Sequence, residues 1–215
     1  LDPLSRKGPD YEKNKFRVIE KSKICDTSFI TSDPKSLDFT IKNSFFMPNP
    51  CDLSLDYLKN YEMNPEHDLF YAISHGVHRG ILRPGKTDER ETFIKKLKSK
   101  CKEIAFDTYG MFGIQPVWGD EFLTKLSNSK MALNLSRGKP LKYYSSDRLA
   151  QLMGNGLLTF INKDTQYGDF FNNNEMIFYS NIDDLSEKII KYSKNDKDWR
   201  KIAKNGHRKY QKYFN

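Results

Sequence analysis

The chain has 215 residues, enough for one large domain or two small ones. Apolar residues make up 37% of it, charged residues 30% and aromatic residues 13%, which is polar but still supplies the Phe and Tyr for a packed core. No apolar run approaches the roughly 18–20 residues of a membrane-spanning helix, and no signal peptide is visible, so a cytoplasmic protein is expected.

The formal net charge is +8, and the lysines are densest near the C-terminus. This balance suits polyanionic partners, namely nucleic acid, anionic lipid headgroups or phosphorylated substrates. The sequence has neither a zinc-finger spacing nor an RNP-type aromatic motif, which argues against specific reading of nucleic acid. Cys25, Cys51 and Cys101 are odd in number and lack metal-site spacing, as in a reduced, cytoplasmic protein.

The first fifty residues predict short elements. These are a helix at 16–23, a strand at 27–31, a helix at 35–42 and a strand at 44–47. Pro48-Asn49-Pro50 ends the last strand. Two interpretations stay open for this part: the tail of a first domain, or the β-α-β edge of a single one.

Residues 51–66 read as a linker with helical character at 56–61, and a strong strand, HDLFYAIS, follows at 67–74. The glycine-flanked turn His75-Gly76-Val77-His78-Arg79-Gly80 comes directly after it. Such a turn lets backbone amides approach a ligand. We expect His75 to face the substrate and Arg79 and Arg83 to meet a diphosphate. Two histidines without a third ligand do not make a metal site, so no metal is predicted.

The next stretch predicts a helix at 87–102, a strand at 103–106 and a helix at 121–127. Thr87 or Asp88 caps the first helix, and its buried stripe is expected to consist of Phe93, Ile94 and Leu97. Between the strand and the second helix lies the aromatic loop 109–113, where Tyr109 and Gly110 could border a nucleotide base.

Residues 131–161 read as strand, loop, helix and strand. Ser145 or Ser146 caps the helix, and its right-handed crossover places the helix N-terminus at the carboxyl ends of the strands. Ligands of open α/β sheets bind at that edge, and a helix N-terminus attracts phosphate. Arg137 and Arg148 can add charge-assisted hydrogen bonds. The alternative is an ordinary βαβ unit with two solvated arginines. A strand at 176–179 and helices at 182–192 and 196–214 complete the chain.

One pattern in this unit resembles a known family. Arg148-x-x-Gln151 followed by Gly156, after a strand ending in Leu-Asn-Leu-Ser, is similar to the C-terminal half of GT-B glycosyltransferases, closest to the "glycosyl transferases group 1" domain of CgeB-like spore-coat proteins. The family pattern, roughly Arg-x-Phe-Glu-x4-Gly-x-Leu-Leu, is matched at Arg148 and Gly156 and at the two leucines that follow. Ala150 stands in place of the aromatic residue. Gln151 replaces the acid that commonly binds ribose, and it can still donate and accept hydrogen bonds.

A weaker likeness is to fucosyltransferases that carry Asn-Ser and then Tyr-x-Thr-Glu-Lys-Leu. The residues of this chain in that order are Asn134, Ser136, Tyr144, Ser146, Asp147, Arg148 and Leu149. Both likenesses imply chemistry on a nucleotide sugar.

The main resemblance implies an α/β fold with a Rossmann-like, doubly wound parallel sheet, the C-terminal half of a GT-B fold, at 51–215. Residues 1–50 would be the remnant of an N-terminal, acceptor-side domain, braced by the last helix. The implied enzyme is a metal-independent hexosyl- or glycosyltransferase that moves a sugar from a UDP- or GDP-sugar to a glycan or lipid-linked acceptor, in surface glycan or lipopolysaccharide assembly. Peripheral contact with the anionic inner face of the membrane stays open.

The residues expected to act are divided between catalysis and nucleotide binding. The catalytic candidates are His75 and Arg79, and the binding candidates are Gly76, Tyr109, Gly110, Asn134, Ser136, Arg137, Tyr144, Ser146, Asp147, Arg148 and Gln151. Two other functions are kept beside this one. The first is a non-catalytic nucleotide- or sugar-binding module, which Gln151 in place of the acid supports, and the second is a basic nucleic-acid-binding protein.

Overall fold

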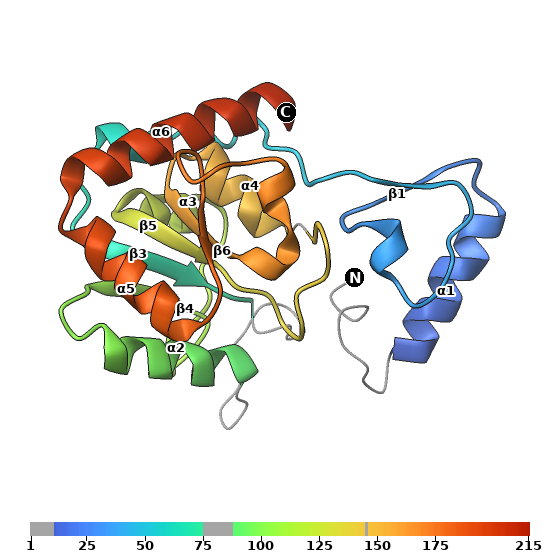
Figure 1. The fold of residues 1–215 in the computed structure, drawn as a ribbon, viewed down its shortest axis with the longest axis horizontal. Coiled ribbons are helices and arrows are strands. Elements are labelled where there is room, and N and C mark those ends of the chain that lie inside the picture. Colours follow the sequence, from blue (N-terminus) through green and yellow to red (C-terminus); the bar gives the residue numbers. More distant parts are fainter. Residues whose placement is uncertain (1–10, 75–87, 145) are drawn as a thin grey trace.

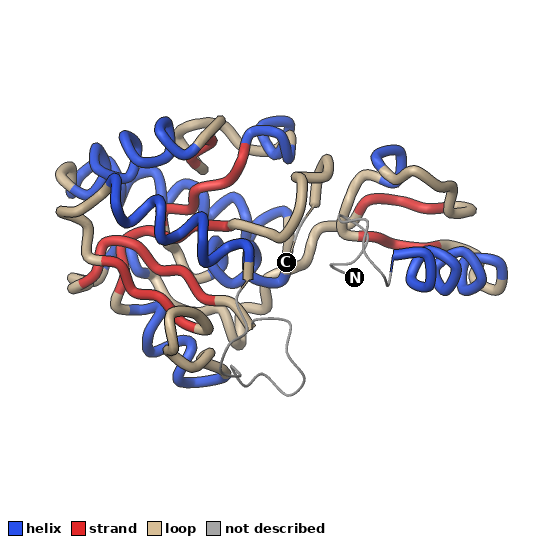
Figure 2. Tube along the Cα trace, turned by 90° about the horizontal axis from the view of Figure 1, so that it is seen from below, coloured by secondary structure: helices blue, strands red, loops and turns tan. Residues whose placement is uncertain are grey.

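A five-stranded parallel sheet forms the centre of the larger part of the molecule. The structure is a computed structural model that describes residues 11–74, 88–144 and 146–215. The strands are β3 (His67–Ala72), β4 (Phe106–Tyr109), β5 (Ser129–Asn134), β6 (Leu158–Asn162) and β7 (Ile177–Tyr179). Their order across the sheet is β4-β3-β5-β6-β7, and every neighbouring pair is parallel. Figure 2 shows the strands in red between blue helices.

Helices cover both faces of this sheet, so it is doubly wound, as the sequence predicts (Figure 1). One face packs against α2 (Glu89–Lys100), α5 (Ile182–Ser193) and α6 (Asp196–Tyr213). The other packs against α3 (Gly119–Ser127) and α4 (Asp147–Gly154). Two short 3-10 turns, at Lys163–Thr165 and Tyr167–Asp169, join β6 to β7.

Strand β3 is buried on both sides, as a parallel strand between two helical layers must be. Leu69 and Tyr71 belong to the core on the α2 side, whereas Phe70 and Ala72 face the α3 side. A strand buried on both faces has a continuous apolar run in its sequence. The sequence therefore predicts β3 well.

The N-terminal part is a separate small unit of helix and sheet (Figure 1). It contains α1 (Tyr11–Lys23) and a two-stranded parallel sheet of β1 (Ser28–Ile30) and β2 (Ser44–Phe46). The helix predicted at 35–42 is wrong, because only a 3-10 turn, Pro34–Ser36, forms there and Leu37 already has extended φ and ψ. A domain boundary at residue 50 stays a prediction.

Two further predicted elements differ from the structure. The helical character expected at 56–61 is reduced to a 3-10 turn, Asn60–Glu62, because the polar side chains of this segment hydrogen-bond to the domain beside it. Strand β4 begins three residues later than expected. The amide of Ile104 donates to the carbonyl of Cys101 in a turn that ends α2. The cap on α2 is confirmed as Asp88, in a complete capping box with Glu91.

The linker before β3 is held against the last helix. The amide of Cys51 donates to the carbonyl of Phe214 at 2.8 Å, and the hydroxyl of Tyr210 donates to the carbonyl of Asn49 at 2.7 Å. At Gly156 the backbone φ is +76°, and a Cβ would lie 2.8 Å from the ring of Tyr61. Glycine is therefore required where the linker crosses the end of α4. None of the helices in the described ranges is long and apolar enough to span a bilayer.

His207 is buried where α6 meets this linker, and it should make stability depend on pH. Its Nδ1 lies 3.3 Å from the hydroxyl of Tyr61. Burial lowers the pKa of His207, and the positive charges of Lys59 and Arg208 lower it further. The unfolded chain binds a proton there below about pH 6.5, whereas the folded chain binds it only at lower pH, so the free energy of unfolding should fall as the pH drops from 7.5 to 5.5.

Urea unfolding at several pH values tests this expectation. His207→Gln should flatten the slope of unfolding free energy against pH, whatever its effect on absolute stability. His67→Gln, which removes a less buried histidine, is the matched control and should keep the wild-type slope. Equal slopes in the wild type and His207→Gln would contradict the assignment.

Candidate functional site

The order of the strands reverses between β3 and β5, and their carboxyl ends diverge to leave a crevice there. Ligands of doubly wound sheets bind at such a switch point. Helix α4 starts beside the crevice, and Ser146 is its N-cap residue, as predicted. Ser146 donates its hydroxyl to Oδ1 of buried Asn134 at 3.3 Å instead of accepting from a helix amide. This contact ties the end of β5 to the start of α4.

Arg148 lies across the crevice, and its placement corrects one expectation. The sequence predicts an exposed arginine, but its side chain is half-buried. Its Nη1 donates to the carbonyl of Leu135 at 2.9 Å, and its guanidinium lies 5.5 Å from the ring centroid of Tyr71. The hydroxyl of Tyr71 donates to the same carbonyl at 2.9 Å. These contacts hold the guanidinium in place, and its remaining N–H groups can donate to a ligand.

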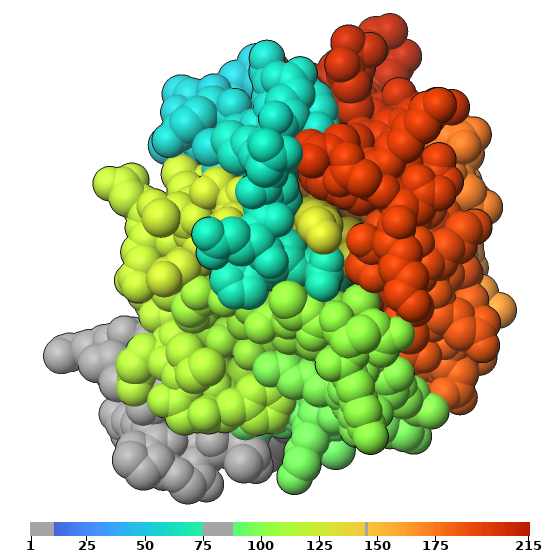
Figure 3. All heavy atoms as spheres, turned by 90° about the vertical axis from the view of Figure 1, so that its left-hand side faces the viewer, coloured from blue at the N-terminus to red at the C-terminus, as the bar shows by residue number. Residues whose placement is uncertain are grey.

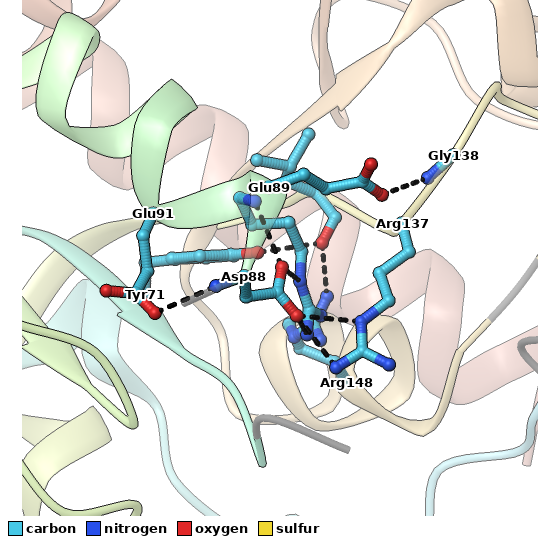
Figure 4. A network of polar contacts seen from close by, with 9 residues as sticks. Tyr71, Asp88, Glu89, Glu91, Arg137, Gly138 and Arg148 are labelled. Carbon is cyan, nitrogen blue, oxygen red and sulfur yellow. Dashed lines mark hydrogen bonds and ion pairs between the residues drawn. The ribbon is translucent and has the colours of Figure 1, made fainter. Parts of the chain in front are cut away.

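A buried carboxylate gathers two more arginines beside it (Figure 4). Asp88 accepts from Nε of Arg90 at 2.8 Å and from Nη2 of the same residue at 2.9 Å. Arg137 reaches the same carboxylate from the loop after β5, with Nη2 2.7 Å from Oδ2. Burial alone would raise the pKa of Asp88, but the hydrogen bonds and charge of Arg90, with the charge of Arg137, hold it well below its usual range. Two guanidinium groups thus share one carboxylate, and the carboxylates of Glu89 and Glu91 lie in the same network.

Both arginines of this network are held by Asp88. Arg137 pairs with it from a side chain that is 22% exposed, so its role in nucleotide binding stays a prediction. Arg90, on α2, is buried. Glu89 accepts from the amide of Gly138 at 2.8 Å, so two contacts tie the start of α2 to the loop after β5 (Figure 4).

Two hollows meet at the start of α4. The first, of about 510 Å³, lies between the N-terminal unit and the sheet edge. Its lining residues from the sheet side include Ser74, Arg90, Ser136, Tyr144, Ser146, Asp147 and Arg148. From the N-terminal unit it takes apolar residues, among them Val18, Phe29, Ile30, Leu37 and Ile41.

The second hollow, of about 300 Å³, lies within the larger domain. It is lined by Leu55, Val117, Trp118, Phe122 and Leu123, together with polar residues that include Asp56 and Gln151. Ser74, Asp147 and Arg148 border both hollows. Trp118 is 55% exposed at the mouth, although it follows buried Val117. The structure thus places an apolar, aromatic pocket and a polar one on either side of Arg148.

The other sequence-predicted residues fall in three places. Tyr109 and Gly110 lie outside the lining of both hollows. Gly110 has φ +72°, and a Cβ there would lie 1.8 Å from the carbonyl oxygen of Ile73, so packing against β3 already accounts for this glycine. His75, Gly76 and Arg79, with Arg83, are outside the described residues.

Sequence reasoning missed several residues of the site. Trp118, Ser74 and Asp56 are not among the residues singled out from the sequence. Burial raises the pKa of Asp56, and the charge of Asp52 adds to this, against hydrogen bonds from Asp52 and Asn155. The available signal for Trp118 was an aromatic residue directly before a helix N-terminus. Among the described residues, no group of three or more His, Cys, Asp or Glu side chains could hold a metal ion.

The charges and donors of the crevice suit an anionic ligand. Arg148 supplies positive charge, and the hydroxyl of Ser136 supplies a donor beside the start of α4. Asp147 partly offsets this charge, and its carboxylate accepts from the amide of Arg148 at 2.9 Å. A phosphate group beside a small aromatic pocket is the chemistry that this arrangement favours.

Comparison with known proteins agrees with this geometry. A family model described as "Glycosyl transferase-like" matches residues 86–215. The structure of TarM is similar with a TM-score of 0.66 at 14% identity, covering 94% of this chain and 43% of that one. A TarM mutant from S. aureus in complex with Fondaparinux, alpha-GlcNAc-glycerol and UDP has a TM-score of 0.65 at 13% identity, covering 99% and 46%. A search of curated proteins found no match.

A third similar structure is sucrose-phosphate synthase from Thermosynechococcus elongatus, with a TM-score of 0.64 at 10% identity, covering 100% of this chain and 61% of that one. At such low identities these likenesses show the fold. The chain spans about half of the length of the solved structures that it matches.

Proposed function

The chain belongs to the glycosyl transferase-like family, whose model covers most of it, and we propose that it binds a nucleotide sugar and takes part in moving the sugar to an acceptor. The observation that carries this proposal is the meeting of the two hollows at Arg148. A nucleotide sugar has an aromatic base, a diphosphate and a polar sugar in a row. The site offers an apolar pocket, a positively charged helix start and a polar pocket in the same order.

In this arrangement the base occupies the smaller hollow, against the indole of Trp118. Gln151 lines that hollow and stands where the family pattern has its ribose-binding acid, so its amide is the proposed ribose contact. Ser136 and the guanidinium of Arg148 then hold the diphosphate, and Ser146, whose hydroxyl donates to Asn134, lies beside them. The sugar extends into the larger hollow, toward the acceptor and the N-terminal unit.

The chemistry proposed for Arg148 follows from the leaving group. Negative charge builds on the diphosphate as the bond to the sugar breaks, and fixed cations stabilise that charge more in the transition state than in the ground state. Arg90 and Arg137 lie beside Arg148, both paired with the carboxylate of Asp88. Such a site needs no metal ion to neutralise the diphosphate, so we propose a metal-independent transfer. His75 and Arg79 stay the proposed catalytic residues.

The identities of the donor and the acceptor belong to the proposal as well. The donor would be a UDP- or GDP-hexose and the acceptor a glycan or lipid-linked glycan, on the cytoplasmic side of surface glycan or lipopolysaccharide assembly. The UDP bound in the TarM mutant structure supports a uridine donor by analogy. The apolar residues that the N-terminal unit adds to the larger hollow support an acceptor with an apolar part.

One observation favours a second candidate, a non-catalytic nucleotide- or sugar-binding module. Gln151 replaces the family acid, and an amide binds ribose hydroxyls less strongly than a charged carboxylate does. Release of free nucleotide from a nucleotide sugar in the presence of acceptor would exclude this candidate. Tight binding to DNA or RNA with a steep dependence on salt would instead support a nucleic-acid-binding protein.

Thermal denaturation with added nucleotides tests the binding proposal directly. We expect UDP or GDP to raise the melting temperature, because a ligand at about 100 times its Kd stabilises the folded state by roughly 2.7 kcal/mol. CMP and dTDP are the matched comparisons with other bases. The absence of a shift with every nucleotide at millimolar concentration would contradict the proposal.

Trp118→Ala should weaken binding of the preferred nucleotide by up to about tenfold, because an aromatic stacking contact contributes about 0.5–1.5 kcal/mol. Trp118→Phe keeps a ring and should recover much of the affinity. Titration calorimetry gives both values. The side chain is largely exposed, so neither variant should unfold the domain. Equal affinities in the wild type and Trp118→Ala would place the base elsewhere.

A further inference from the structure

The outer face of α6 carries a continuous row of basic side chains, which we name the α6 basic row. Its members are Lys197, Lys201, Lys204, Arg208 and Lys212. They follow one another at intervals of three or four residues, so they share one face of the helix. The opposite face is buried in the protein and includes Trp199, Ala203, Gly206 and Tyr210. At 1.5 Å per residue the row is about 22 Å long.

Acidic side chains do not neutralise this row. The ion pairs of α6 in the described part of the chain are on its flanks, where Arg200 meets Asp196 at 2.7 Å and Lys209 meets Glu175 at 2.8 Å. None of the described carboxylates lies within ion-pair distance of the α6 basic row. The row also lines neither of the two hollows, so the proposed nucleotide site does not account for it.

Exposed apolar side chains lie beside the row. Residues 52–57, which we name the linker strip, run next to α6, as Figures 1 and 3 both show. The hydrogen bond from Cys51 to the carbonyl of Phe214 holds the strip there. The strip exposes Leu53 by 50%, Leu55 by 61% and Tyr57 by 60%, and α6 adds Tyr213, which is 62% exposed.

We propose that the α6 basic row and the linker strip together bind an anionic membrane surface. A row of cations without ion-pair partners is attracted to acidic lipid headgroups. Each one or two lysine or arginine side chains near the membrane surface raise the affinity about tenfold. Leucine and tyrosine beside the cations insert at the headgroup boundary, which is where such side chains are favoured. Nucleic acid would use the same cations, but it has no apolar layer for the leucines. The apolar strip therefore favours a lipid surface.

Sedimentation with vesicles tests the proposal on the full chain. The chain should bind vesicles of phosphatidylglycerol mixed with phosphatidylcholine, and hardly bind vesicles of phosphatidylcholine alone. Combining Lys201→Gln, Lys204→Gln and Arg208→Gln should weaken binding to the anionic vesicles about a hundredfold. The matched control combines Lys95→Gln, Lys96→Gln and Lys102→Gln, which removes the same charge from exposed positions on and after α2. It should weaken binding by no more than about threefold.

The apolar part has its own test. Leu53→Ser combined with Tyr57→Ser should weaken binding to the anionic vesicles at least about tenfold, because neither residue lines a hollow and both lose apolar surface that a membrane would bury. Equal losses of binding in the two charge-removing sets, or unchanged binding in the Leu53 and Tyr57 variant, would overturn the proposal. A single-stranded RNA oligonucleotide is the competing ligand. If the chain binds this RNA more tightly than the vesicles, and the variant with Lys201, Lys204 and Arg208 replaced loses that binding, the partner is a nucleic acid and the proposal is overturned. All the replaced residues are exposed or half-buried on the surface, so folding should survive every substitution.

Discussion

Arg148→Ala is expected to weaken nucleotide binding about ten- to a hundredfold in titration calorimetry. The guanidinium borders both hollows, and we propose that it meets the diphosphate at the start of α4. A charge-assisted hydrogen bond contributes about 1.5–3 kcal/mol, which gives that range of affinity. Arg148→Lys keeps the charge but loses the fork of donors that holds the carbonyl of Leu135, so it should recover only part of the affinity.

The structure also changes the stability expected of this variant. A solvated arginine could be removed with little effect on the melting temperature, but Arg148 donates to a backbone carbonyl and packs against Tyr71. Arg148→Ala should therefore lower the free energy of unfolding by about 1 kcal/mol. Lys95→Ala, at an exposed position on α2, is the control and should change neither affinity nor stability. If both variants bind every nucleotide equally well, the nucleotide site lies elsewhere.

Much of the fold could be predicted because its signals are local. Strand β3 is an unbroken apolar run, α2 begins at a capping residue, and the βαβ unit at 131–161 has its apolar stripes at the right spacing. The failures occurred where long-range contacts outweighed local preference. The segment at 56–61 has helix-compatible residues, yet Asp56 and Asn60 bind to α4 and to the strand-β5 region instead.

The site was predicted less completely than the fold, for a physical reason. Arg137 and Arg148 both follow β5 in sequence, and nothing local distinguishes the arginine that pairs with a carboxylate from the one that faces the crevice. The partner of Arg137 is Asp88, 49 residues earlier. Trp118 joins the same crevice from the opposite side of the sheet edge. These contacts between residues far apart in the chain follow from the strand order, which a single sequence does not reveal.

Asp88→Ala is expected to destabilise the protein by about 3–5 kcal/mol, because it removes the carboxylate that pairs with the buried Arg90 guanidinium. The Arg90 side chain beside it is only 6% exposed, so water cannot replace the carboxylate. The variant also removes the N-cap of α2, and such a loss alone costs about 0.5–2 kcal/mol. Asp88→Asn keeps a capping oxygen but not the charge, so it should lie between the wild type and Asp88→Ala in urea unfolding.

The matched control is Asn181→Ala, because Asn181 caps α5 through two backbone amides but carries no ion pair. It should cost about 1 kcal/mol, as a cap alone does. Since the folded pKa of Asp88 is depressed, its charge stabilises the protein above the unfolded value of about 3.9, and this stabilisation is lost as the pH falls below it. The advantage of the wild type over Asp88→Asn should therefore shrink below about pH 4. An effect of Asp88→Ala no larger than that of Asn181→Ala would show that Asp88 acts only as a cap.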